Sequence, residues 1–327
     1  MTLPKLLAYV SIILFGAIGI AAIFKSKPAP ESIALSNEGP WEVELDNEIQ
    51  SVVPAFAAPS AEKPLSRATF MAELPEADRI EELFNKNEPK AGEFVETVVY
   101  KSHVAWLKGR PAWLSDYASH YETSRHFIAR SLNGKADYFK QDVSEGDRFN
   151  VLRKDKNIEF YLVVDTSRCK MWFYCLAEKE KKPFLIKTYP VGLGCLDSSS
   201  PSGLLTPLGK YTLGDRIAIY RPKSMGIYQG KKIEMVTVFG TRWIPFDQEI
   251  GLVTAPAKGL GLHGTPWERT SSGDLISSQS GIGKYESDGC IRLNTPDLEE
   301  LFSIIITKPT TIEIVSDFEN SSLPGIQ

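Results

Sequence analysis

The chain has 327 residues, of which 43% are hydrophobic and 24% charged, and this ordinary composition excludes wholesale disorder. Its length predicts two folded units with connecting chain. A formal net charge of -4 argues against a nucleic-acid binder, which needs a basic face for phosphates, and four cysteines are too few for a disulfide scaffold.

An apolar segment near the start of the chain predicts a membrane anchor. Residues 6–24 are nineteen positions without a charge, with Lys5 before them and Lys25 and Lys27 after them. This run approaches the ~20 residues that cross a bilayer, and it exceeds the ~7–15 residues of a secretory h-region. We expect residues 1–27 to be an uncleaved anchor. A cleaved signal peptide and a buried helix of a soluble domain are the alternatives.

Residues 28–65 have the composition of a linker. They are rich in Pro, Ala, Ser and Glu, and residues 31–64 contain seven acidic residues against one basic residue. Such a segment buries little apolar surface, so we expect an extended chain that holds the folded part away from the membrane. A docking tail for a basic partner is the alternative.

Residues 66–157 are predicted to form a small helical region. Apolar residues recur at helical spacing in Ile80–Phe84 and again in Val95–Val99. We expect four aromatic residues to lie in the core rather than to stack on a ligand, and three histidines to pack or face solvent rather than to bind a metal. These residues are Trp106, Trp113, Tyr117 and Tyr121, and His103, His120 and His126.

Part of this region resembles a carbohydrate-binding module. Residues 127–152, which include Ser-Glu-Gly-Asp-Arg-Phe-Asn-Val at 144–151, are similar to the second half of a LysM module. That family binds the N-acetylglucosamine backbone of peptidoglycan or chitin. The resemblance implies contact with glycan strands.

Residues 158–316 are predicted to form a mostly β domain, followed by a tail at 317–327. The β-rich runs are separated by turn residues, and one helix is expected at 295–306, with Thr295 as its N-cap and Pro296 at its first position. The runs lie at 160–165, 170–176, 184–190, 209–213, 234–239 and 311–315.

A cysteine and a histidine in this domain predict nucleophilic catalysis. Cys290 follows a glycine where a loop meets an apolar run, and His263 is the sole histidine of the β domain. Cysteine attacks as the thiolate, so its pKa near 8.5 is expected to fall beside an imidazole or a cation. Gly289 lets backbone N–H groups approach a substrate oxygen, and Arg292 is placed to pair a carboxylate. A small buried hydrophobe is the alternative role of Cys290.

These residues resemble the signature of the L,D-transpeptidase catalytic domain, the YkuD domain. In that family a His-Gly pair precedes a Ser-His-Gly-Cys-Ile-Arg segment, matched here by residues 263–264 and 287–292. Further matches follow in family order over residues 160–315, at 161–165, 189–194, 206–211, 240–243 and 262–265.

Two features of the sequence depart from the family pattern. Asp288 stands where the family usually has histidine, and a carboxylate there disfavours the thiolate unless it points away or is paired, for instance with Arg292. His263 and Cys290 are 27 positions apart, more than is usual in the family, because of a polar insertion near residues 267–278. We expect this insertion to cover the cleft.

The resemblance implies an α+β fold with a mainly-β sandwich or barrel as the catalytic domain. It implies a peptidoglycan L,D-transpeptidase without cofactor or metal, in which Cys290 is the nucleophile and His263 the general base. A carbonyl, that of Gly264, orients the imidazole, and the amides of Gly289 and Cys290 hold the oxyanion.

The implied substrate is the peptide stem of peptidoglycan. Cys290 attacks the bond between the diamino acid and the terminal D-alanine, and the thioester passes to an amine of a second stem. Substrate contacts carried over from the family fall on Arg292, Ser287, Asp288, Asn294 and Trp243.

Several points stay open in the sequence. The acceptor is an amine or water, which makes the enzyme a transpeptidase or an L,D-carboxypeptidase, and a non-catalytic peptidoglycan-binding protein is the alternative from another class. Because the polymer lies outside the inner membrane, we expect an anchored protein whose catalytic domain lies in the periplasm. The pairing of Cys169, Cys175 and Cys195, and the oligomeric state, are not determined by the sequence.

Overall fold

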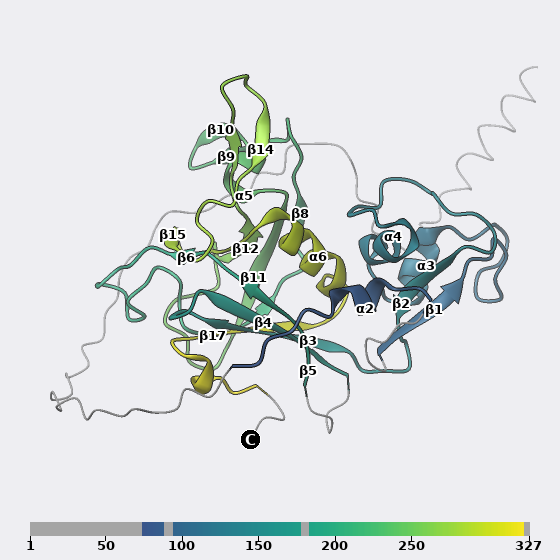
Figure 1. Cartoon of the computed structure of the whole chain (residues 1–327), viewed down its shortest axis with the longest axis horizontal. Coiled ribbons are helices and arrows are strands. Elements are labelled where there is room, and N and C mark those ends of the chain that lie inside the picture. Colours follow the sequence, from purple (N-terminus) through teal and green to yellow (C-terminus); the bar gives the residue numbers. More distant parts are fainter. Residues whose placement is uncertain (1–73, 88–93, 178–182, 324–327) are drawn as a thin grey trace, which may run out of the picture. The chain divides into compact units, whose positions relative to one another are not determined.

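The computed structural model describes residues 74–87, 94–177 and 183–323 (Figure 1). The expected anchor at 1–27 and linker at 28–65 lie outside the described residues. In the part of the chain that is described, no helix is long and apolar enough to cross a membrane.

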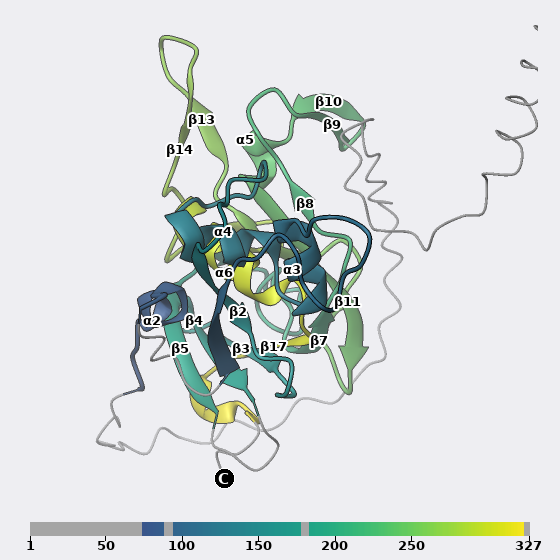
Figure 2. The same ribbon diagram turned by 90° about the vertical axis from the view of Figure 1, so that its right-hand side faces the viewer.

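A nine-stranded mixed sheet forms the centre of the mainly-β domain, which confirms the expected fold class (Figures 1 and 2). Most neighbours are antiparallel, but β17 pairs in parallel with β3, and β12 pairs in parallel with β16. The strands in spatial order are β16 (Ile291–Leu293), β12 (Gly261–Gly264), β11 (Arg242–Ile250), β7 (Gly209–Leu213), β17 (Thr310–Val315), β3 (Glu159–Asp165), β4 (Lys170–Leu176) and β5 (Phe184–Pro190), with β8 (Ala218–Ile219) on β11.

Both faces of β3 and β4 are covered, which explains their almost continuous apolar sequences. Alternate residues of β3, such as Leu162, join the main core with helix α6 (Thr295–Ile305). The intervening residues pack with Trp172 of β4 against the 3-10 helix η2 (Phe318–Asn320), where the Phe318 ring lies 4.5 Å from the Trp172 ring. Residues 317–323 of the expected tail therefore form part of the domain.

Helix α6 confirms the prediction for 295–306, with its cap shifted by one residue. Asn294, not Thr295, is the N-cap, and its side chain accepts a hydrogen bond from the Asp297 amide at 3.0 Å. Pro296 lies in the first turn, as expected. The helix packs on the sheet through Leu298, Leu301 and Phe302.

The region before the sheet mixes helices and strands. It contains α2 (Ile80–Phe84), β1 (Val95–Val99), α3 (Leu114–His120), α4 (Arg125–Asn133) and β2 (Arg148–Leu152). The helical expectation is confirmed at Ile80–Phe84 but wrong at Val95–Val99, which pairs antiparallel with β2. Three valines in five residues suit a strand, and helical spacing over so short a window does not distinguish the two structures.

The aromatic residues and histidines of this region mostly pack. Tyr117 is buried, Trp106 and Tyr121 pack against the same small core, and Trp113 is 56% exposed, contrary to the expectation of a core position. His120 stacks on Trp106 with ring centres 4.2 Å apart.

Two ion pairs, of which one is buried, join this region to the sheet domain. Arg242 of β11 is 1% exposed and pairs with Asp137, which also lies 3.2 Å from the His126 ring. Lys308 pairs with the exposed carboxylate of Glu122 at 2.8 Å.

Two hairpins project from the same end of the sheet domain (Figures 1 and 2). One is formed by β9 (Met225–Tyr228) and β10 (Lys231–Glu234), the other by β13 (Trp267–Arg269) and β14 (Leu275–Ser277). An ion pair between Arg269 and Glu234 links them. The predicted strand at 234–239 is wrong: β10 ends at Glu234 and the helix α5 (Val236–Phe239) follows, because Val236 and Phe239 are both buried one turn apart.

Candidate active site

The parallel pairing of β12 with β16 brings the predicted nucleophile and base to the same face of the sheet. Leu262 lies opposite Ile291, and His263 lies opposite Arg292. Because side chains alternate along a strand, His263, Arg292 and Cys290, which directly precedes β16, project to the same side. The long insertion in sequence therefore does not separate the two residues in the fold.

His263 is held as a neutral base. Its Nδ1 lies 2.8 Å from the carbonyl oxygen of Gly264, which can only accept, so Nδ1 carries the proton and Nε2 is the basic nitrogen. The side chain is 3% exposed, and burial lowers the pKa of His263 to about 4 against the opposing effect of the Gly264 hydrogen bond. The contact of the imidazole with the Gly264 carbonyl agrees with the sequence-based expectation.

Cys290 is a neutral thiol in this structure. Burial raises the pKa of the Cys290 thiol to about 12, a backbone hydrogen bond from Gly261 and the charge of Arg292 lower it, and Asp288 raises it further. The thiol sulfur lies 3.8 Å from the Gly259 carbonyl oxygen. The expectation that the pKa of Cys290 falls is therefore wrong for this state, because desolvation outweighs the favourable charges.

The loop before Cys290 is fixed by close packing and internal hydrogen bonds. Gly289 has φ +113°, and a Cβ atom there would lie 2.9 Å from the Leu205 carbonyl oxygen, so only glycine fits. Ser287 is buried, and its hydroxyl donates to the Cys290 carbonyl at 2.6 Å and accepts from the Gly289 amide at 3.2 Å. The Ser287 hydroxyl was expected to contact substrate and the Gly289 amide to hold an oxyanion, but in this structure both groups form hydrogen bonds within the loop.

Thr206 also fixes this loop, although sequence reasoning did not single it out as a site residue. It is fully buried, and its hydroxyl donates to the Gly289 carbonyl at 3.0 Å and accepts from the Gly194 amide at 2.7 Å. The family match at 206–211 was the available signal.

Arg292 lies beside both reacting groups. Its charge acts on Cys290 and His263, and one guanidinium nitrogen donates to the Glu286 carbonyl at 3.4 Å. Its backbone exchanges two hydrogen bonds of 2.8 Å with Gly192, which fixes the strand that carries it. Arg292 is thus a half-buried cation close to both Cys290 and His263.

Asp288 is exposed and its partner is not Arg292. Its carboxylate accepts a hydrogen bond at 3.4 Å from the hydroxyl of Tyr228, the last residue of β9 in the β9–β10 hairpin. The sequence contained no signal for Tyr228, because the contact joins residues 60 positions apart.

An aromatic cluster surrounds the imidazole. The Phe239 ring packs edge-on against His263 at 5.3 Å, and Tyr228 packs edge-on against Phe239 at 5.4 Å. Trp243 lies opposite His263 in the β11–β12 pair, with ring centres 6.0 Å apart. Trp243 therefore borders the site, and its expected substrate contact stays a prediction.

Two other predicted features form contacts at the start of α6. Both polar atoms of the Asn294 side chain bind Asp297 in the helix cap, and its expected substrate contact stays a prediction. The insertion at 267–278 forms the β13–β14 hairpin, which is tied to the start of α6 by a hydrogen bond from the Trp267 ring N–H to Thr295 and by a hydrogen bond between the hydroxyls of Ser277 and Thr295. Whether the hairpin covers the cleft stays a prediction.

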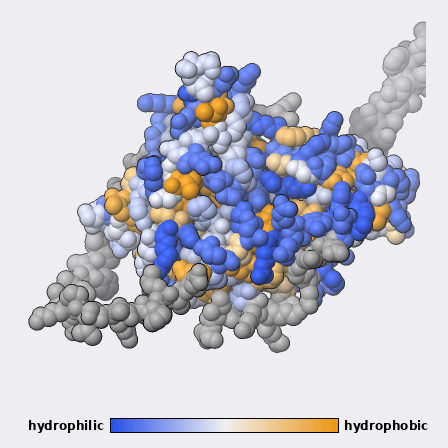
Figure 3. All heavy atoms as spheres, in the orientation of Figure 1, coloured by the Kyte–Doolittle hydropathy of each residue, from blue (hydrophilic) through white to orange (hydrophobic). Residues whose placement is uncertain are grey.

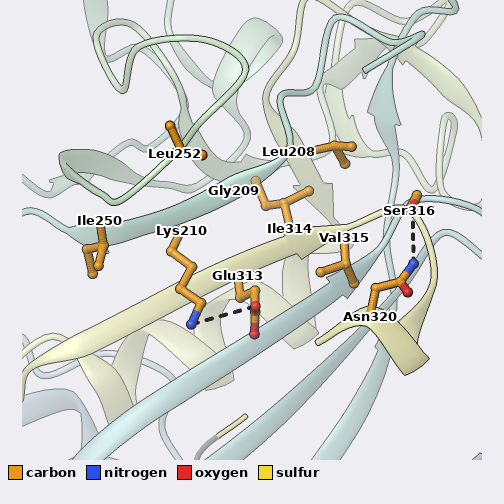
Figure 4. Close-up of a pocket in the computed structure, with 10 residues that line it drawn as sticks. All are labelled: Leu208, Gly209, Lys210, Ile250, Leu252, Glu313, Ile314, Val315, Ser316 and Asn320. Atoms are coloured by element: carbon orange, nitrogen blue, oxygen red, sulfur yellow. Dashed lines mark hydrogen bonds and ion pairs between the residues drawn. The ribbon is translucent and has the colours of Figure 1, made fainter. Parts of the chain in front are cut away.

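A groove of about 430 Å³ lies elsewhere on the sheet (Figure 4). Leu208, Ile250 and Leu252 give it an apolar lining, and Lys210 and Glu313 form an ion pair of 3.7 Å within it. None of the predicted site residues lines it. The molecular face in Figure 3 is mainly hydrophilic, with scattered apolar patches.

Metal-type clusters and disulfides are absent from the described ranges. No group of three or more His, Cys, Asp or Glu side chains there could hold a metal ion. All four cysteines are free thiols, and burial raises the pKa of Cys169 and Cys175.

Comparison with known families assigns the domain that carries this site. Residues 159–314 match the model of YkuD, the L,D-transpeptidase catalytic domain. The sheet domain therefore belongs to the L,D-transpeptidase catalytic domain family. No curated protein matches the chain.

Solved structures with similarity to the chain cover about half of it. They include Bdellovibrio bacteriovorus Bd1075 (17% identity, 48% of each chain, TM-score 0.33) and the helical cell shape determining protein Pgp2 from Campylobacter jejuni (15% identity, 49% of each chain, TM-score 0.33). Mycobacterium tuberculosis L,D-transpeptidase 1 has 15% identity over 51% of this chain and 70% of that one, with a TM-score of 0.25. The chain thus spans about half the length of the first two structures.

Proposed function

We propose that this protein is a peptidoglycan L,D-transpeptidase in which Cys290 is the nucleophile and His263 the general base. The observation that carries the proposal is the β12–β16 register, which sets a buried thiol and a neutral imidazole on one face of the sheet of a YkuD domain. The Gly264 carbonyl fixes the tautomer that leaves Nε2 free to take a proton.

Acylation begins from the neutral pair. Nε2 of His263 takes the thiol proton as the sulfur attacks the carbonyl between the diamino acid and the terminal D-alanine. Because the proton leaves the sulfur while the sulfur attacks, no free thiolate forms in the buried site. In this scheme the Cys290 amide would hold the oxyanion, since the Gly289 amide already donates to the Ser287 hydroxyl. His263 then protonates the leaving D-alanine amine, and a thioester remains on Cys290.

The second half of the reaction transfers the acyl group. A neutral side-chain amine of a second stem attacks the thioester, His263 removes its extra proton, and Cys290 recovers a proton as it leaves. The product links the diamino acids of two stems. Arg292 pairs with a substrate carboxylate, and Trp243 forms part of the wall of the site. No residue role in this scheme requires a metal or an organic cofactor.

The proposed substrate places the domain outside the inner membrane. Residues 6–24 would anchor the chain with its C-terminal part in the periplasm, and residues 28–65 would span the distance to the polymer. Whether residues 127–152 act as a LysM-like glycan contact stays a prediction.

Incubation of the purified protein with a tetrapeptide muropeptide tests the proposal. A cross-linked dimer that has lost one D-alanine is the expected product. Monomeric tripeptide would identify an L,D-carboxypeptidase instead. Unchanged substrate would refute both activities and favour a non-catalytic binding protein.

Mass spectrometry after exposure to a carbapenem tests the nucleophile separately. A covalent adduct on Cys290 is expected for the wild type. The matched variant Cys290→Ser, which keeps size and shape, is expected to fold normally and to carry no such adduct. An adduct on another cysteine, with Cys290 unmodified, would contradict the assignment.

A further inference from the structure

Asp288 is an exposed carboxylate beside the nucleophile, and the proposed reaction leaves it without a role. Its hydrogen-bond partner is the Tyr228 hydroxyl, at 3.4 Å. Within the described ranges, no Lys, Arg or His forms an ion pair with Asp288 at 4.0 Å or less. A carboxylate has about four acceptor positions, so most of its capacity stays open to a ligand.

As long as it has no cationic partner, the Asp288 carboxylate disfavours the reaction of the neighbouring Cys290 thiol. The negative charge of Asp288 contributes to the raised pKa of the Cys290 thiol. It also opposes the oxyanion that forms when the thiol attacks. A cation bound to Asp288 would cancel both effects, which makes a cationic ligand the chemically favourable occupant.

The surroundings of Asp288 fit an ammonium group. Tyr228 adds a hydroxyl oxygen and a half-buried aromatic ring, which packs edge-on against Phe239 and is thereby held in place. Ammonium groups bind both carboxylates and aromatic faces. Arg292 follows Cys290 and Asp288 precedes it in the chain, and the charges of both act on the Cys290 thiol.

We propose that Asp288, oriented by Tyr228, binds a primary ammonium group of the stem peptide next to Cys290. The proposal rests on the function proposed above and names the substrate chemistry of that site. The ammonium comes either from the diamino acid of the donor stem or from the acceptor stem, whose bound ammonium loses its proton to solvent before the neutral amine attacks the thioester. Binding the cation there selects stems that carry a free amine.

A pair of small thiol reagents tests the charge preference without any turnover. Aminoethyl methanethiosulfonate carries an ammonium, and sulfonatoethyl methanethiosulfonate carries a sulfonate. In each case the Cys290 sulfur attacks the reagent sulfur, a disulfide forms, methanesulfinate leaves, and the thiol proton passes to solvent. Peptide mass spectrometry gives both rates at Cys290, and the thiolate fraction cancels in their ratio.

We expect Asp288→Asn to reduce the cation-to-anion rate ratio about twofold to fivefold, the effect of one exposed ion pair. Asp288→Glu should keep the preference, because it keeps the charge. Tyr228→Phe should keep most of it, because it removes only the hydroxyl. Asp247→Asn, which removes the same charge from an exposed position of β11, should change nothing.

Two arms with natural chemistry identify the source of the amine. If the donor supplies it, Asp288→Asn will reduce the preference for a tetrapeptide with a free side-chain amine over the acetylated one, measured as D-alanine release. If the acceptor supplies it, the same variant will raise the KM for an amine-bearing tripeptide.

The outcomes separate this inference from the proposed function. Equal reagent ratios in the wild type and Asp288→Asn overturn the role of Asp288, and so does a Cys290 that reacts with neither reagent. Failure of the wild type to release D-alanine from any donor refutes the transpeptidase proposal, while the reagent ratio still reports on Asp288.

Discussion

The charge state of Cys290 and His263, the proposed catalytic pair, leads to a sharp prediction about pH. Burial raises the pKa of Cys290 to about 12 and lowers that of His263 to about 4, so between these values both groups are neutral. At pH 7 a thiol with that pKa is ionised to about one part in 10⁵, against about 3% for an unperturbed cysteine. Alkylation of Cys290 by iodoacetamide should therefore be roughly 10³-fold slower than that of a free cysteine, and should rise about tenfold per pH unit through neutrality.

The alternative is a preformed thiolate and imidazolium, which gives a different profile. An ion pair would produce a rate plateau that begins well below pH 7. The assay is peptide mass spectrometry of iodoacetamide labelling between pH 5 and pH 10, with Cys290→Ser as the background for the other thiols. His263→Gln should alkylate within about threefold of the wild type, because a neutral imidazole adds no charge, yet should lose acylation. A plateau near neutral pH that disappears in His263→Gln would refute this account of the site.

Three further predictions concern stability. The pKa of His263 falls from 6.5 in the unfolded chain to about 4 in the fold, so the unfolded state binds more protons between these pH values. As the pH falls from 6.5 to 4, the free energy of unfolding of the wild type should therefore decrease by about 3 kcal/mol relative to that of His263→Gln, measured by urea titration. Asp137→Ala removes the closer of the two carboxylates that pair with the buried Arg242 guanidinium, the other being Glu299 at 3.7 Å, and should cost about 3 kcal/mol. Glu122→Ala, which removes an exposed carboxylate, should cost less than about 1 kcal/mol, and equal costs would contradict the difference in burial. Gly240 has φ +60°, and a Cβ atom there would lie 2.7 Å from the Gly264 Cα, so Gly240→Ala should lower the free energy of unfolding by at least about 3 kcal/mol. Gly230 has φ +71° but lies in open space, so Gly230→Ala should lower it by about 1 kcal/mol, both measured by thermal unfolding. Similar losses in the two glycine variants would show that the close approach to β12 is unimportant.

The sequence by itself determined the local elements that are long and consistently patterned. The strands β3, β4, β5, β7 and β17 were predicted to within one residue, because β-branched and aromatic runs between turn residues leave little ambiguity. Helix α6 followed from its proline and acidic first turn. The short segments were less determined: Val95–Val99 became a strand and 234–239 a turn of helix, since pairing and burial with distant residues outweigh local pattern in five or six residues.

In the candidate site, too, some features follow from the sequence and others only from the tertiary structure. Counting histidines in the β domain identified His263 and Cys290, but only the parallel β12–β16 register put them on one face although they are 27 positions apart. Spacing carried no information about desolvation, so the direction of the Cys290 pKa was decided by the closed fold around it. The contact of Asp288 with Tyr228 likewise depends on a hairpin 60 residues away. The identities of the residues determine which chemistry the site can perform. The tertiary structure determines the charge states of Cys290 and His263 and the residues that surround them.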